Sequence, residues 1–104
     1  MPNENTEKIL TIIAQIPSGK VANYGQIARL AGLPKNARQV GFVLRNLSDS
    51  SIPWFRVVNS KGEIASRGSE CESIQKEALL EEGIEFDSND RISLKKFGWH
   101  PEDS

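Results

Sequence analysis

Cysteine and histidine each occur only once in this chain of 104 residues, at Cys71 and His100. A single cysteine excludes a disulfide within the chain, and the pair cannot supply the four ligands of a structural zinc site. No apolar run approaches the roughly 20 residues that a membrane-spanning helix needs. Residues 1–5 lack the basic start and apolar stretch of a signal peptide. We therefore expect a cytoplasmic protein with no metal, no other cofactor and no membrane partner.

Aromatic residues are also few, at 7% of the chain, but hydrophobic residues reach 38% and charged residues 26%. This composition is typical of a small globular protein and too apolar for a disordered one. The length allows one core, and the chain contains no repeat, low-complexity tract or linker. We expect a single domain over residues 1–104, present as a monomer.

The net charge of −1 argues, taken alone, against binding to nucleic acid. Its distribution is uneven, because residues 20–67 contain eight basic and two acidic side chains, a net charge of +6. Residues 68–104 contain four basic and ten acidic side chains, a net charge of −6. Screening limits each charge to about 10 Å, so the central segment can attract a polyanion locally. The alternative is that the two charged halves only keep the protein soluble.

Apolar spacing predicts three helices in the first half of the chain. They are expected over residues 5–16, 26–31 and 36–47. Asn5 or Thr6 is expected to cap the first helix, and Gly32 to end the second. The second and third helices, joined by a short turn, match a helix-turn-helix over about residues 24–47.

The second half is expected to contain shorter elements. A hairpin or loop pair is predicted over residues 52–65, with its turn at residues 59–62. Ser69 and Glu72 form a capping box that predicts a helix reaching about Glu82. The inward side chains of that helix are expected to be Ile74, Ala78 and Leu79. Residues 84–86 and 92–97 are interpreted as short strands or extended segments, and Trp99 as an anchoring aromatic.

One face of the third helix is basic. Arg38, Phe42 and Arg45 follow at i, i+4 and i+7, opposite the apolar stripe. Gly41 adjoins this face at a cost of roughly 1 kcal/mol against alanine, which favours a site where another backbone approaches closely. Many proteins with two such helices never contact DNA, so this pattern alone leaves the function open.

The segment Pro53-Trp54-Phe55-Arg56 is the second unusual feature. A tryptophan between proline and phenylalanine either fills the core or lines a site for a flat ligand, since aromatic rings stack on nucleobases. Arg67 could return to such a site and lie over a ring. Its spacing does not establish this.

Four segments together resemble the DNA-binding domain of the O6-alkylguanine-DNA alkyltransferases. They are residues 21–28, 37–41, 45–46 and 53–57. In those enzymes a Pro-Cys-His-Arg-Val motif carries the alkyl-accepting cysteine, and here Trp54 takes its place. This substitution, and the absence of a separate N-terminal domain, resemble the alkyltransferase-like proteins, which bind such lesions without repairing them. The resemblance covers about residues 5–85.

The resemblance implies a mainly α fold with small β elements, a winged-helix-like helix-turn-helix domain of the alkyltransferase C-terminal type. It implies minor-groove binding of O6-alkylguanine in duplex DNA, with base flipping and no alkyl transfer. It also implies that the lesion is flagged to nucleotide-excision repair proteins. Phe55 departs from the family, where a histidine relays the cysteine's proton, so both nucleophile and relay are missing.

Specific roles follow for the family-matched positions. By resemblance, Arg38 fills the space that the flipped base leaves, and Tyr24 crowds the backbone phosphate. Gly41 allows close approach to the groove, Arg45 contacts phosphate, and Asn46 matches a family asparagine that shapes the pocket loop.

The lesion pocket is expected in a loop over about residues 52–68. Its walls would be Pro53, Trp54, Val57 and Arg67, with Arg67 making a cation–π contact to the flipped base.

Two other functions stay open. One is residual alkyltransferase or glycosylase activity, for which Cys71 is poorly suited because no histidine lies near it in sequence. The other is a helix-turn-helix regulator that reads undamaged sequence.

Overall fold

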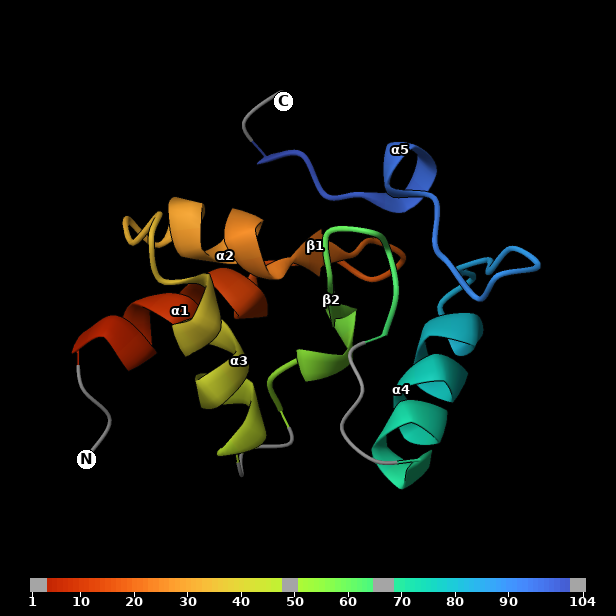
Figure 1. Ribbon diagram of the computed structural model, residues 1–104, viewed down its shortest axis with the longest axis horizontal. Coiled ribbons are helices and arrows are strands. Elements are labelled where there is room, and N and C mark those ends of the chain that lie inside the picture. Colours follow the sequence, from red (N-terminus) through yellow and green to blue (C-terminus); the bar gives the residue numbers. More distant parts are fainter. Residues whose placement is uncertain (1–3, 48–50, 65–68, 102–104) are drawn as a thin grey trace.

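The computed structural model of the chain describes residues 4–47, 51–64 and 69–101, the first three residues of the last range by their backbone only (Figure 1). Its elements are α1 (Glu4–Ala14), β1 (Ala22–Asn23), α2 (Tyr24–Leu30), α3 (Ala37–Arg45), the 3₁₀ turn η1 (Trp54–Arg56), β2 (Val57–Val58), α4 (Ser69–Glu81) and α5 (Leu94–Phe97). The described residues are thus mainly helical, with one small sheet, as the sequence predicts.

The first three helices enclose one apolar core (Figure 1). Ile9 and Ile13 lie one turn apart on α1, so the same side of that helix is fully buried. Ile27 of α2 and Val40 of α3 complete the centre of this core. This packing fixes α3 against α1 and α2, which leaves its opposite face outside.

A two-stranded parallel sheet joins the two halves of the molecule. Ala22 pairs with Val57 and Asn23 with Val58. The C-terminal segment is tied to the residue before β1, because the Val21 N–H donates to the Phe97 carbonyl at 2.9 Å. The Trp99 N–H donates back to the Val21 carbonyl at 2.8 Å, and its ring packs on the first core. Trp99 is therefore the anchor that the sequence predicts.

A second, smaller cluster lies under α4. Leu79 and Ile84 are buried there with Val58 and Ile92. Gly83 ends the helix with φ of +89°, a left-handed conformation that glycine adopts at low cost. In Figure 1 α4 lies on the opposite side of β2 from α3.

The predicted helices are confirmed, but their ends need correction. α1 already includes Glu4, so Asn5 and Thr6 lie inside the helix and the cap assigned to them is wrong. α2 begins at Tyr24, two residues early, because the Asn23 side chain accepts from the Gln26 N–H at 2.8 Å. This N-cap satisfies a backbone donor that would otherwise lack a partner.

Three predictions for the second half need correction. Of the hairpin or loop pair predicted over residues 52–65, the turn is present and is closed by the Gly62 N–H on the Asn59 carbonyl at 3.0 Å, but Val57–Val58 pairs with β1 rather than in a hairpin. Part of the segment 92–97 is helical, since Ser93 caps α5. On α4, Ile74 is predicted to point inward but is 51% exposed, and the adjacent Gln75 is buried. The capping box rests on the Ser69 side chain, outside the described residues, although α4 does begin at that residue.

Candidate nucleic-acid interface

A tight turn joins α2 to α3. Gly32 has φ of +80°, and the Leu33 N–H donates to the Ala28 carbonyl at 2.8 Å, which closes the end of α2. α2 and α3 then pack through Ile27 and Val40. The pair has the arrangement expected of a helix-turn-helix, so the second helix presents a fixed outer face.

The outer face of α3 carries three exposed side chains. Arg38, Phe42 and Arg45 are all exposed, whereas Val40 and Val43 point into the core. Gly41 lies beside this face, and a Cβ there would have no atom of the described residues within 4 Å, apart from its chain neighbours and the backbone of α3 itself. Packing within the protein therefore does not require glycine at this position.

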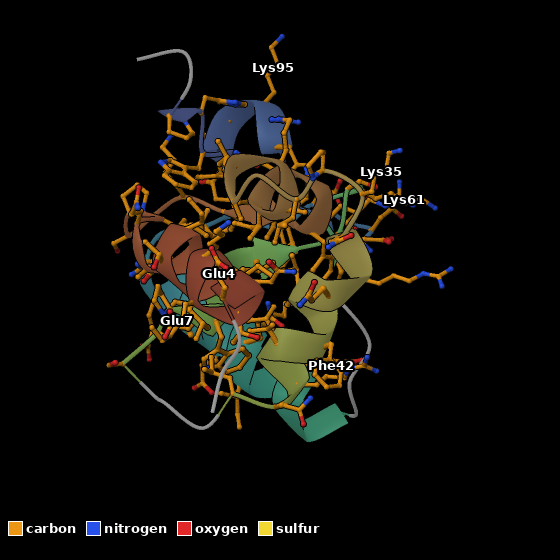
Figure 2. All side chains as sticks on the ribbon, turned by 90° about the vertical axis from the view of Figure 1, so that its left-hand side faces the viewer. Glu4, Glu7, Lys35, Phe42, Lys61 and Lys95 are labelled. Carbon is orange, nitrogen blue, oxygen red and sulfur yellow. The ribbon has the colours of Figure 1, made fainter. Side chains whose placement is uncertain are left out.

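Further cations lie on the same side of the molecule. Figure 2 shows Lys35 and Lys61 on the side to which Phe42 projects, while Glu4 and Glu7 lie on α1. Lys35 belongs to the turn between α2 and α3, and Lys61 to the turn after β2. A polyanion approaching α3 from this side would meet positive charge.

The loop that carries the family motif is ordered by a short 3₁₀ turn. The Arg56 N–H donates to the Pro53 carbonyl at 3.1 Å, and the chain then enters β2. Trp54 is half-buried and packs on the first core. Part of the side chain is therefore a core residue, and its role in lining a site stays a prediction.

Phe55 is enclosed by its neighbours. The Trp54 ring meets it edge-on, with 5.9 Å between centres and an interplanar angle of 85°. The Arg56 guanidinium carbon lies 5.3 Å from the centre of the Phe55 ring. The ring is thus an apolar packing group, which can neither accept nor relay a proton.

Arg56 and Glu82 form the main polar anchor of this loop. The Arg56 Nε donates to Glu82 Oε1 at 3.0 Å, and its Nη1 donates to the Ile16 carbonyl at 2.8 Å. Burial alone would raise the pKa of the Glu82 carboxyl. Hydrogen bonds from Arg56 and from the Gly19 N–H together lower it by more, so the pKa lies below its usual range. One guanidinium therefore connects the loop to residues just after the ends of α1 and α4.

Gln75 is a second anchor from α4. Its side chain is 2% exposed, and its Nε2 donates to the carbonyls of Phe55 at 3.0 Å and Val57 at 2.9 Å. These two carbonyls flank Arg56. The amide thus fixes the backbone immediately after Trp54.

Replacing Gln75 with leucine should lower the free energy of unfolding by about 2 kcal/mol, because one buried and one partly buried carbonyl lose a donor while the side-chain volume is kept. Urea denaturation measures this difference. Gln15→Leu is the matched control, since Gln15 is exposed at the end of α1 and little change is expected there. Equal stability of the Gln75 variant and the unsubstituted protein would contradict the anchoring role.

The remaining predicted site residues occupy different places. Tyr24 is the first residue of α2 and packs partly on the core. Asn46 ends α3, where its side-chain amide donates to the Phe42 carbonyl at 2.8 Å. Arg67 lies outside the described residues. The roles assigned to all these positions stay predictions.

A cavity of about 490 Å³ lies elsewhere, between α4 and the segment 86–90. Its lining includes Glu63, Glu72 and Asp90, whose charge repels nucleic acid. Lys76 is paired with Asp90 at 2.9 Å. We therefore do not assign the flipped base to this cavity.

Sequence reasoning missed Gln75, Glu82 and Asn23 as residues that hold the site. Asn23 had a signal, an asparagine three residues before Gln26, which is typical of a helix N-cap. Gln75 and Glu82 had none, because their partners lie 20 and 26 residues away.

Comparison with known proteins shows to which family this chain belongs. The model of the 6-O-methylguanine DNA methyltransferase DNA-binding domain matches residues 4–84. A DNA base-flipping protein of Vibrio parahaemolyticus is 47% identical over 90% of this chain and 94% of its own length. Alkyltransferase-like protein 1 of Schizosaccharomyces pombe is 40% identical over 90% of this chain and 93% of its own length.

Solved structures similar to this chain indicate the same family as the relatives found by sequence. S. pombe Atl1 in complex with damaged DNA containing O6-carboxymethylguanine superimposes with a TM-score of 0.85. It is 40% identical, and the match covers 97% of this chain and all of that one. The O6-methylguanine methyltransferase of Mycobacterium tuberculosis, 24% identical with a TM-score of 0.70, shares the fold over half of its length. The chain belongs to the alkyltransferase-like family, as the Trp54 motif and the paired helices indicate.

Proposed function

We propose that this protein binds O6-alkylguanine in duplex DNA through the minor groove and flips the lesion out of the stack without transferring its alkyl group. Some of the relatives are named DNA base-flipping proteins, and the crystal structure of Atl1 is a complex with damaged DNA containing O6-carboxymethylguanine. Both observations support the proposal. The protein would act on chromosomal DNA in the cytoplasm.

Two observations carry the proposal together: the anchored loop that contains Trp54, and the exposed basic face of α3 with Arg38 and Arg45. By the resemblance of residues 53–57 to the enzymes' Pro-Cys-His-Arg-Val motif, Trp54 would stand at the position of the nucleophilic cysteine and the enclosed Phe55 at that of the relay histidine. An indole and a phenyl ring can pack on a base but cannot accept an alkyl group in this way. The loop therefore favours binding over catalysis.

A gel shift with two duplexes of one sequence, with and without a single O6-methylguanine, tests this function. We expect preference for the damaged duplex of roughly tenfold or more, because a weakly paired base costs less to flip. Equal affinity for both would instead support a regulator that reads undamaged DNA. Mass spectrometry of the protein and the DNA after binding tests whether the protein is an enzyme. A methylated protein or a released base would disprove the proposal that it binds the lesion without reacting with it.

Gly41→Ala should separate folding from DNA binding. Alanine is favoured by roughly 1 kcal/mol inside a helix, and the added methyl has free space, so the free energy of unfolding should rise. If DNA approaches α3 at this position, the same methyl should weaken binding to both duplexes. Thermal denaturation and the gel shift measure the two effects, and unchanged DNA affinity would remove Gly41 from the interface.

We also propose that nucleotide-excision repair proteins dock on the outer face of α4. Ile74 and Leu80 are each 51% exposed there, next to the exposed Glu77 and Glu81. This acidic face would repel DNA and so stay accessible while α3 is bound. A supershift of the protein–lesion complex by purified damage-recognition proteins tests this. If the supershift persists with the Ile74→Ser, Leu80→Ser double variant, the partner docks on another surface than the outer face of α4.

A further inference from the structure

Phe42 has no role in the fold or in the proposed flipping step. Its side chain is 58% exposed. Among the described residues, the other exposed large hydrophobic side chains are Ile74 and Leu80, each at 51%. Figure 2 shows it projecting from α3 into solvent. Leaving an aromatic ring in water is unfavourable, so an apolar surface that covers this ring would be bound favourably.

The neighbours of Phe42 restrict what can cover it. Arg38 lies one turn before it on α3, and Arg45 one turn after it, and both are exposed. A partner that covers the ring must therefore also accept the flanking positive charges, which a polyanion does and an apolar protein surface does not.

We propose that Phe42 is an apolar contact to the minor groove, packing on deoxyribose and base edges beside the nucleotide that the protein flips. This rests on the proposed function. Minor-groove proteins combine apolar side chains such as phenylalanine, which contact the base steps, with arginine and lysine side chains. Because four helical residues rise about 6 Å, the contact lies within about two base pairs of Arg38.

The contact is to the duplex rather than to the lesion. Phe42 therefore adds affinity for DNA of either kind and does not set the preference for damage. It also carries no charge, so it displaces no counterions and leaves the salt dependence of binding unaltered.

Fluorescence anisotropy with Phe42→Ala tests the proposal, using the same damaged and undamaged duplexes over a series of salt concentrations. We expect binding to both duplexes to weaken by roughly tenfold, with the ratio between them and the salt slope unchanged. Gln15→Ala is the matched control, because Gln15 is an exposed, uncharged residue after the end of α1 and its loss should leave affinity unaltered.

Undiminished affinity of Phe42→Ala for both duplexes would overturn the proposal. So would an altered salt slope, which would mean that the variant disturbs the arginines. A failure of lesion binding is distinguishable, since the unsubstituted protein would then bind both duplexes equally whatever Phe42 does.

Discussion

Arg38→Ala should weaken binding to a duplex containing O6-methylguanine by roughly a hundredfold, or about 2.8 kcal/mol. The Arg38 side chain is exposed on the outer face of α3, and packing in the core does not require it. The variant should therefore fold normally. In the bound state its planar guanidinium would stack in the space that the flipped base leaves and donate to the orphaned partner base. Undamaged DNA, which is flipped less readily, should lose less affinity.

Two further variants separate stacking from charge. Arg38→Lys keeps the charge but loses the planar group, so it should recover nonspecific binding and little of the lesion preference. Lys95→Ala removes one positive charge on α5, far from Phe42 in Figure 2, and should leave affinity nearly unchanged. If Arg38→Ala binds the damaged duplex as tightly as the unsubstituted protein, another residue fills the vacated space.

The exposed face of α3 could be predicted because it depends only on helix geometry. Arg38, Phe42 and Arg45 share a side of any regular helix, and Val40 identifies which side is buried. The same local rule predicts α1 and α2. A helix-turn-helix is well suited to such prediction, since its elements are close in sequence.

The restraints on the Trp54 loop could not be predicted in this way. Val57 pairs with Ala22, 35 residues earlier, and the residue pattern of neither segment indicates that the other is its pairing partner. On α4 the apolar pattern predicts Ile74 as an inward residue and gives no role to Gln75. The structure exposes Ile74 and buries Gln75, because Gln75 meets two backbone carbonyls that only the folded loop provides. Hydrophobic periodicity cannot distinguish a polar residue that has buried partners from one that lies in water.

Arg56→Ala should lower the free energy of unfolding by about 3 kcal/mol at neutral pH, because it leaves a partly buried carboxylate without its partner. The two side chains are only 16% and 13% exposed, and Arg56 also donates to the Ile16 carbonyl. Since typical domains are stable by only about 5–15 kcal/mol, such a loss is large. Urea denaturation should show it, with Arg91→Ala as the control, because the Arg91–Glu63 pair is more exposed and contributes less.

The pH dependence identifies the ion pair as the cause. Glu82 has a lower pKa in the folded than in the unfolded chain, where its ordinary value is near 4.5. Its contribution is therefore complete above that value and is lost as the pH falls through the folded pKa. The stability difference between the unsubstituted protein and Glu82→Gln should accordingly shrink as pH falls from 6 toward 3. A difference that stays constant over this range would show that the loop is held by packing and by Gln75, and that the charge of Glu82 contributes nothing.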